Sequence, residues 1–261
     1  MAKNIHGSST PSWQRVVIWI IAIAMAGGSL LGFFFMAFAT KNPNVDPTQI
    51  VANKEKDAQK QLTAKQDERQ KKIDAQNATL TKKYFATLNE FKSRVAAFEP
   101  TGIGDVKAED LKAGDGAKIT ADNGADYAMY YIGWKPSGDI FDSSIDGDKL
   151  KSPLSGSGSY ITGWNEGVIG MKIGGVRLIT IPSDKAYGAK GSGCDDNGQN
   201  CTIPPDTPLK FIVMAIPTPA NIPYPKGTLA ICEKAVVSQA AQYGVTPTVF
   251  CQAYGYDNEA K

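Results

Sequence analysis

The chain has 261 residues, of which 42% are hydrophobic, enough for one sizeable domain with appendages and too many for a chain that is unstructured throughout. Its formal net charge of +2 excludes a uniformly basic or acidic protein, but the charge is unevenly distributed. Residues 51–94 hold eleven Lys or Arg and six acids, whereas residues 95–261 hold fourteen Lys or Arg and nineteen acids. A basic middle segment therefore joins an apolar N-terminal region to an acidic C-terminal half.

The first expected element, after a short polar tail at residues 1–15, is a transmembrane helix over residues 16–39. Ser29 is the one polar side chain among these 24 residues, and about 20 apolar residues are enough for a helix to cross a bilayer. Because Ala37-Phe38-Ala39 resembles a cleavage site, a cleaved signal peptide is the alternative.

The charges beside this apolar segment predict its orientation. Lys3 and Arg15 favour a cytoplasmic N-terminus, so we expect a single-pass cell membrane protein whose C-terminal domain lies outside the cytoplasm. Three small residues also recur at a spacing of four, a pattern that lets two membrane helices pair closely. A homodimer through the span or the stalk is therefore a further hypothesis, resting on Ala24, Gly28 and Gly32.

A long helical stalk is expected next, over residues 48–99. This segment has no Gly or Pro, is rich in good helix formers, and is followed by Pro100. Its second half carries one apolar stripe, formed by Ile73, Leu80, Tyr84, Leu88, Phe91, Val95 and Phe98. The segment is expected to be a spacer whose stripe packs on the following domain or on a twin, and the alternative is a coiled coil or a helix that cradles the substrate.

Residues 100–218 are predicted to form an α+β domain, in which a small antiparallel sheet wraps around one short helix. Strand-like runs enriched in β-branched and aromatic residues alternate with Gly-rich turns. The runs are 118–120, 125–134, 140–144, 176–181 and 209–216, and the brief helix lies near Trp164–Val168. Residues 219–261 should form a helical extension, with a helix from Thr228 to Tyr243 and a second one after Pro247.

The four cysteines all follow the apolar segment, and an even number in an exported domain predicts disulfides. We expect Cys194 to pair with Cys201 and Cys232 to pair with Cys251, although four cysteines allow three connectivities and free thiols are the alternative. A zinc site is not expected, because no C-x-x-C spacing occurs and the single histidine, His6, precedes the apolar segment.

Five strings occur in one order between Tyr130 and Val213: YYIGWKPSGDIFDSS, YITGWNEGVIGMKIGGVRLITIP, AYG, IPP and LKFIV. Together they resemble an FKBP-type peptidyl-prolyl cis/trans isomerase. The resemblance implies an FKBP-like fold and rotation about X-Pro bonds, without a cofactor or a metal. It also implies that the substrates are proline-containing unfolded or exported polypeptides, and no nucleic acid is expected as a partner.

The resemblance further implies a set of site residues. Tyr131, Asp142 and Tyr187 would be catalytic, with the Tyr187 hydroxyl on a substrate carbonyl and Asp142 beside the twisting imide. Trp164 would form the floor under the proline ring, and the Ile161 backbone N–H would bind a second carbonyl. The remaining substrate-binding walls would be Phe141, Tyr160, Ile203 and Phe211.

Two segments depart from the family pattern. Residues 152–160, SPLSGSGSY, are shorter and poorer in aromatic residues than usual, with Leu154 as a stand-in for a missing ring and Tyr160 in place of a small aliphatic residue. The loop after AYG is expanded and contains Asp195, Asp196 and Asn197, for which calcium binding is an alternative.

The sequence thus predicts a membrane-tethered folding catalyst for exported proteins. The two rival hypotheses are a non-catalytic FKBP-like binding or scaffold module of the cell envelope, and a tether that works through its stalk or its tail.

Overall fold

A computed structural model describes residues 47–260, so the predicted tail, transmembrane helix, cleavage site and small-residue pattern lie outside the described residues. Among the helices that residues 47–260 form, none has both the length and the apolar character needed to cross a bilayer. The chain divides into two compact units. Among the described residues, one unit contains 47–69 together with 223–260, and the other contains Gln70–Ile222.

The predicted stalk is a single helix, α2 (Pro47–Phe91), which contributes residues to both units. It ends eight residues before the predicted end at residue 99, where a 3-10 turn at Lys92–Arg94 leads into extended backbone. This early end has a physical reason, because the following segment bonds to the turn between two strands. The Trp134 Nε1–H donates to the Ala96 carbonyl at 3.0 Å, and the Phe98 N–H donates to the Pro136 carbonyl at 2.9 Å.

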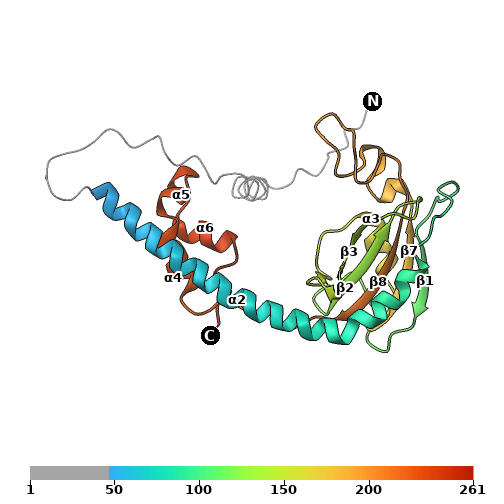
Figure 1. Cartoon of the computed structure of the whole chain (residues 1–261), viewed down its shortest axis with the longest axis horizontal. Helices are drawn as coiled ribbons and strands as arrows, with labels where there is room; N and C mark the ends of the chain where they lie inside the picture. The colour runs from blue at the N-terminus through green and yellow to red at the C-terminus, as the bar shows by residue number, and fades with distance from the viewer. Residues whose placement is uncertain (1–46, 261) are drawn as a thin grey trace, which may run out of the picture. The chain divides into compact units, whose positions relative to one another are not determined.

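The Gln70–Ile222 unit is built on an antiparallel sheet, in which the strands follow the order β1-β7-β8-β2-β3 (Figure 1). These strands are β1 (Lys107–Lys112), β7 (Val176–Ile181), β8 (Leu209–Pro217), β2 (Tyr127–Trp134) and β3 (Ile140–Ser143). A two-residue strand, β6 (Leu154–Ser155), also pairs with β2, and β4 (Ile145–Asp146) pairs with β5 (Lys149–Leu150). The short helix α3 (Thr162–Val168) follows β6. The α+β class predicted from the sequence is confirmed.

The two central strands, β2 and β8, are buried on both faces, which explains their nearly continuous apolar sequences. One face packs against α3 in a core that includes Trp164, Ile179 and Phe211. The opposite face packs against the second half of α2, whose Leu88 is fully buried. Apart from Ile73, the predicted apolar stripe thus packs within the Gln70–Ile222 unit, and a coiled coil is not supported.

Four of the five predicted strands are confirmed at nearly the predicted positions, as β2, β3, β7 and β8. The exception is 118–120, where Lys118 makes only an isolated bridge with Lys172. The edge strand β1 was not predicted, because its sequence KAEDLK is almost fully exposed and lacks strand-like residues. Among the described strands it pairs with β7 alone, in a register that begins with Lys107 opposite Thr180.

The other unit packs three short helices against the first part of α2. These helices are α4 (Thr228–Ala235), α5 (Val237–Gln242) and α6 (Pro247–Ala253). The predicted helix from Thr228 to Tyr243 is therefore two helices, because Val236 leaves the helical region with φ −119°. Ser238, at the start of α5, donates from its N–H to the Glu55 carboxylate on α2 at 2.7 Å.

A disulfide between Cys232 and Cys251 links α4 to α6, as the sequence predicted. Both sulfurs lie in a small buried cluster with Leu62 of α2, Val236 and Phe250.

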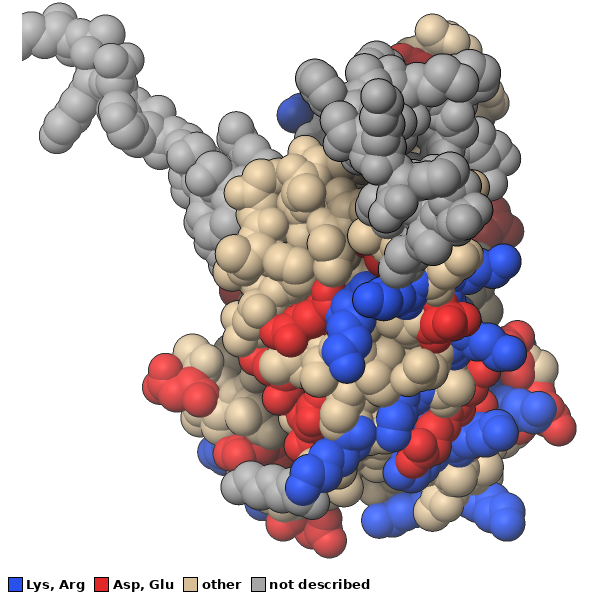
Figure 2. Space-filling view, turned by 90° about the vertical axis from the view of Figure 1, so that its left-hand side faces the viewer, with Lys and Arg blue, Asp and Glu red and all other residues tan. Residues whose placement is uncertain are grey.

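On the face of the molecule shown in Figure 2, Lys and Arg side chains are interspersed with Asp and Glu. This face therefore has no large patch of one charge.

Candidate active site

A cavity of about 400 Å³ opens on the face of the sheet that carries α3. Its lining comes from β2, β3, β6, β8, α3 and the residues that lead into it, and the loop after β7. The lining residues are Tyr131, Phe141, Asp142, Leu154, Ser159, Tyr160, Ile161, Trp164, Tyr187 and Phe211. Eight of these ten are residues that the sequence predicted as site residues.

Trp164 lies at the base of the aromatic part of this cavity. Tyr131 and Phe211 stand edge-on to its indole, with ring centroids 5.6 and 5.2 Å away and interplanar angles of 89° and 86°. Only 3% of Trp164 is exposed, yet its ring still borders the cavity together with Tyr187 and Asp142. Trp164 therefore forms the floor of the cavity, and the rings of Tyr131 and Phe211 stand nearly perpendicular to its indole.

Two glycines on α3 allow this floor to lie so close to the sheet. A Cβ on Gly163 would lie 2.2 Å from Cγ2 of Ile181, and one on Gly167 would lie 2.4 Å from Cγ2 of Ile179. Neither distance is compatible with a side chain, so only glycine permits α3 to pack directly on β7. This close packing fixes the height of Trp164 under the cavity.

Arg177, in β7, anchors the other end of α3. Its guanidinium donates to the Gly167 carbonyl at 3.1 Å and to the Ile169 carbonyl at 2.9 Å, which are backbone acceptors at the C-terminal end of the helix. The same group forms a two-point ion pair with Asp110 of β1, at 2.7 and 3.1 Å. Arg177 thus ties the helix that carries Trp164 to two strands, a role that sequence reasoning missed.

Asp142 lies at one side of the cavity in a defined network. The Tyr131 hydroxyl donates to its Oδ2, the Ser143 N–H donates to its Oδ1 at 2.8 Å, and Lys151 forms an ion pair with Oδ1 at 3.3 Å. Burial alone would raise the pKa of Asp142, but these three partners together lower it. Burial and the bond to Asp142 raise the pKa of Tyr131. At neutral pH the pair is therefore a carboxylate and a neutral phenol.

Apart from the buried Nε1–H of Trp164, two donors at the cavity have no acceptor within residues 47–260. The Ile161 backbone N–H precedes the first turn of α3 and makes no hydrogen bond there. The Tyr187 hydroxyl likewise has no partner in the described part of the chain, and 38% of this residue is exposed. Burial, followed by the charge of Asp142, raises the pKa of Tyr187, so its hydroxyl stays protonated at neutral pH. Both groups are available to donate to carbonyl oxygens of a bound peptide.

Ile203 is the one predicted wall residue that does not line the cavity. It is 3% exposed and belongs to the core, and its backbone pairs with Ser192 across the expanded loop. Its side chain packs in the same core cluster as Trp164 and Phe211, outside the cavity lining. Ser159 lines the cavity but was not predicted, because a serine in a Gly/Ser-rich turn carries no distinguishing signal.

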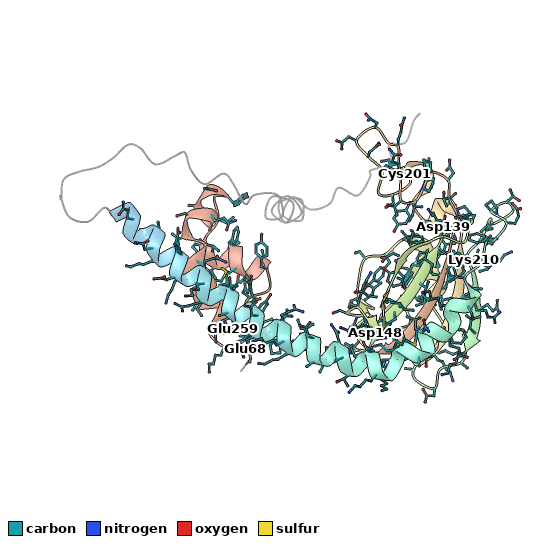
Figure 3. The ribbon with its side chains drawn as sticks, viewed as in Figure 1. Glu68, Asp139, Asp148, Cys201, Lys210 and Glu259 are labelled. Carbon is teal, nitrogen blue, oxygen red and sulfur yellow. A yellow bond between two sulfur atoms is a disulfide. The ribbon has the colours of Figure 1, made fainter. Side chains whose placement is uncertain are left out.

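The expanded loop after β7 is closed by the Cys194–Cys201 disulfide, as predicted. Figure 3 shows Cys201 in this loop, which projects beyond the end of the sheet. Within the loop, the Asp195 carboxylate accepts from the N–H groups of Asn197 and Gln199 and from the Asn200 side chain. These bonds use the carboxylate to hold the turn. Among the described residues, no cluster of three His, Cys, Asp or Glu side chains is placed to hold a metal ion.

The model of the FKBP-type peptidyl-prolyl cis-trans isomerase family matches residues 117–216, which contain the whole cavity. An FK506-binding protein of Neisseria meningitidis is 40% identical over 111 residues, covering 42% of this chain and 94% of that protein. The chain belongs to the FKBP-type peptidyl-prolyl cis-trans isomerase family.

Other proteins are similar to a part of the chain. A probable FK506-binding protein of Corynebacterium glutamicum is 43% identical over 91 residues, covering 34% of this chain and 73% of that protein. A crystal structure of a peptidyl-prolyl cis-trans isomerase from Pseudomonas syringae pv. tomato shares 28% identity, with a TM-score of 0.34, over 50% of this chain and 90% of that one. The FKBP domain is thus an enzyme, a peptidyl-prolyl cis-trans isomerase, joined to segments outside the family match.

Proposed function

We propose that the aromatic cavity binds a prolyl residue of a polypeptide and accelerates rotation about the preceding peptide bond. The observation that supports this most directly is the combination of an apolar indole floor with two donors that lack partners in residues 47–260, the Ile161 N–H and the Tyr187 O–H. An apolar floor suits a proline ring, and the two donors suit the carbonyl groups on either side of it.

The chemistry needs no nucleophile. Rotation about a peptide bond faces a barrier of about 18–20 kcal/mol, because the amide is conjugated. A catalyst must bind the twisted form better than either planar form, and a thousandfold acceleration needs about 4 kcal/mol of such preference.

Each group at the cavity has a proposed part in that preference. The walls of Tyr131, Phe141 and Phe211 remove water from the imide oxygen, which favours the less polar twisted form. The Ile161 N–H and the Tyr187 hydroxyl hold the flanking carbonyls, so the chain rotates about a fixed segment. Asp142, oriented by the Tyr131 hydroxyl, interacts electrostatically with the imide as it twists.

A comparison of two tryptophans tests this role of the cavity. Trp164→Phe removes part of the floor, whereas Trp134→Phe removes a buried indole on the opposite face of the same sheet. We expect Trp164→Phe to lower kcat/KM for prolyl peptides by about tenfold or more, which is about 1.4 kcal/mol of lost transition-state binding. Trp134→Phe should lower stability through loss of its bond to Ala96 but leave kcat/KM within about twofold. Equal effects of both changes on kcat/KM would contradict the proposal.

The name of these relatives, FK506-binding protein, supports the same cavity as the site for FK506 in this chain. Competition between FK506 and a prolyl peptide is the corresponding measurement. A ligand of the cavity should inhibit isomerisation and protect the fluorescence of Trp164 from quenchers.

We further propose that the enzyme acts on exported polypeptides while tethered to a cell membrane, with the isomerase domain outside the cytoplasm. Two features support this placement. Residues 16–39 form an apolar run long enough for a bilayer-crossing helix, and all four cysteines are in disulfides, which persist in oxidising compartments.

Labelling of thiols in intact cells tests the location. The four cysteines should resist an alkylating reagent until a reductant is added, and protease added to spheroplasts should cut the chain after residue 47. Four reactive cysteines in unreduced cells, or protection from protease, would contradict the exported location.

A further inference from the structure

A second cavity lies in the Gln70–Ile222 unit and shares no lining residue with the aromatic cavity. Its volume is about 380 Å³, within the range of cavities that bind small ligands. Three segments line it: Pro100 after α2, the turn between β2 and β3, and the residues that lead into β8. Figure 3 labels Asp139 and Lys210, which adjoin this turn and these residues at the same end of the sheet. The second cavity is therefore a separate candidate site.

The walls of the second cavity are formed before any ligand binds. Four of its eight lining residues are prolines, in which the ring fixes the backbone angle φ: Pro100, Pro136, Pro204 and Pro208. The Phe98 N–H donates to the Pro136 carbonyl at 2.9 Å, and the Lys210 ammonium lies 4.6 Å from the centre of the Phe98 ring. These contacts join the segment after α2 to the turn and to β8. A ligand therefore does not have to order the walls.

The lining is rich in hydrogen-bond acceptors and poor in donors. Its prolines have no backbone N–H. The Ser137 hydroxyl already donates to the Asp139 carboxylate at 2.7 Å. The Thr207 hydroxyl already donates to the Pro205 carbonyl at 3.3 Å. A ligand that fits this lining has to bring its own N–H or O–H group.

The charges at the second cavity are opposite and unpaired. The Asp206 carboxylate and the Lys135 ammonium both border it, and neither has an ion-pair partner among residues 47–260. Asp206 has φ 53°, in the left-handed region that Asp and Asn adopt more readily than other side chains do, and its N–H donates to the Gly188 carbonyl at 2.9 Å. Because the two charges give the lining no net charge, the best fit is an uncharged group that donates to the carboxylate.

The side chains that combine these properties are the indole of tryptophan and the phenol of tyrosine. Each is uncharged at neutral pH and has one hydrogen-bond donor. The face of an aromatic ring carries partial negative charge, which favours contact with the C–H groups of proline rings. Pro208 is buried, whereas Pro100, Pro204 and Asp206 are exposed, so the second cavity is open to solvent. An aromatic side chain of a polypeptide can therefore enter it.

The two cavities are close enough for one polypeptide to occupy both. Pro208 lines the second cavity and Phe211 lines the aromatic cavity. They are three residues apart at the start of β8, which corresponds to about 10 Å in extended backbone. About four extended residues of a bound polypeptide cover that distance. A polypeptide is therefore a ligand that this arrangement suits.

We propose that the second cavity binds a tryptophan or tyrosine side chain of a polypeptide, as an attachment point separate from the aromatic cavity. This contact requires no proline in the bound segment. It goes beyond the isomerase activity and does not depend on it, because the two linings have no residue in common.

Titration with blocked amino acids tests the assignment on the full chain in mild detergent. N-acetyl-tryptophanamide has the charge of a residue inside a chain, and N-acetyl-phenylalaninamide has a ring without a donor. Binding is followed by ligand-observed NMR, and comparison between variants cancels partition of the probes into detergent. The variants are Pro204→Ala and Asp206→Asn. Their matched controls are Pro205→Ala and Asp196→Asn, which lie in the same loop outside the lining.

We expect Pro204→Ala to raise the Kd of the tryptophan probe by about three- to tenfold, because one ring of the wall is lost. Asp206→Asn should reduce the preference for the tryptophan probe over the phenylalanine probe by about threefold, because the charged acceptor is lost while Asn tolerates the same φ. The two controls should leave both quantities within about twofold of wild type. Thermal melting and isomerisation of a short prolyl peptide check that each variant is folded.

Three results would overturn the proposal. The first is an equal Kd of the tryptophan probe in Pro204→Ala and Pro205→Ala. The second is binding of free tryptophan without binding of the blocked amide, which assigns the cavity to a small molecule. The third is loss of the probe in Trp164→Phe but not in Pro204→Ala, which places it in the aromatic cavity. Failure of the proposed isomerase mechanism appears instead as an unchanged kcat/KM in Trp164→Phe, and it leaves the second cavity unaffected.

Discussion

Replacing Arg177 with methionine should destabilise the isomerase domain, although the residue lies outside the cavity. The Arg177 side chain is 9% exposed and joins three partners: the Gly167 and Ile169 carbonyls and the Asp110 carboxylate. Methionine keeps most of the apolar stem but removes all donors. The two carbonyls at the end of α3 then lose their charged donor.

The structure indicates which of these losses dominates. A hydrogen bond to a charged group contributes about 1.5–3 kcal/mol, and two such bonds to backbone carbonyls are lost. The Asp110 side chain is 50% exposed, so its ion pair is screened and adds about 1 kcal/mol or less. Partial access of water to the carbonyls offsets some of the first loss. We therefore expect Arg177→Met to lower the free energy of unfolding by about 3 kcal/mol, and Asp110→Asn to lower it by about 1 kcal/mol or less.

Urea unfolding measures both values. A chain starting at residue 47 retains only Trp134 and Trp164 of the four tryptophans, and both report on the Gln70–Ile222 unit. The reasoning is refuted if Asp110→Asn costs as much as Arg177→Met, because the exposed ion pair would then carry the stability. A cost below about 1 kcal/mol for Arg177→Met would refute it as well.

Three further outcomes are expected. The folded pKa of Asp142 is lowered, so its ionised form stabilises the fold above the unfolded pKa of about 3.9, and this contribution is lost as the pH falls through the lowered value. Urea unfolding between pH 7 and pH 2 should therefore show a smaller acid loss in Asp142→Asn than in wild type, and identical pH profiles would contradict this. Tyr187→Phe should lower kcat/KM for prolyl peptides about three- to tenfold without changing thermal stability, because the hydroxyl has no partner within the described residues. A lower melting temperature would instead indicate a structural bond. Replacing Cys232 and Cys251 with alanine should lower the free energy of unfolding of the unit that contains residues 223–260 by about 3 kcal/mol, since the disulfide joins residues 19 positions apart. Limited proteolysis should then cut residues 223–260 faster, while isomerase activity persists.

Much of the site was accessible from the sequence, because the residues that form it come in short, ordered strings. Three of these strings contain a site residue. Trp164 lies between Gly163 and Gly167, Asp142 lies in FDSS, and Tyr187 lies in AYG. The structure brings them to one cavity. Ile203 lies in the core cluster and not in the lining of this cavity, and nothing in the string IPP indicates that its backbone pairs with Ser192.

Local sequence determined the elements whose residue types act over a few positions. Apolar and β-branched runs specified β2, β7 and β8, and the absence of Gly and Pro specified most of α2. Tertiary contacts decided the rest. The end of α2 at Phe91 depends on bonds from Trp134 and Phe98 to partners distant in sequence, and β1 exists only because β7 offers it an edge. The inclination of the Tyr160 ring at 40° to the indole of Trp164 was decided in the same way, because the angle between two rings depends on how separate segments pack and leaves no periodic signal in the chain.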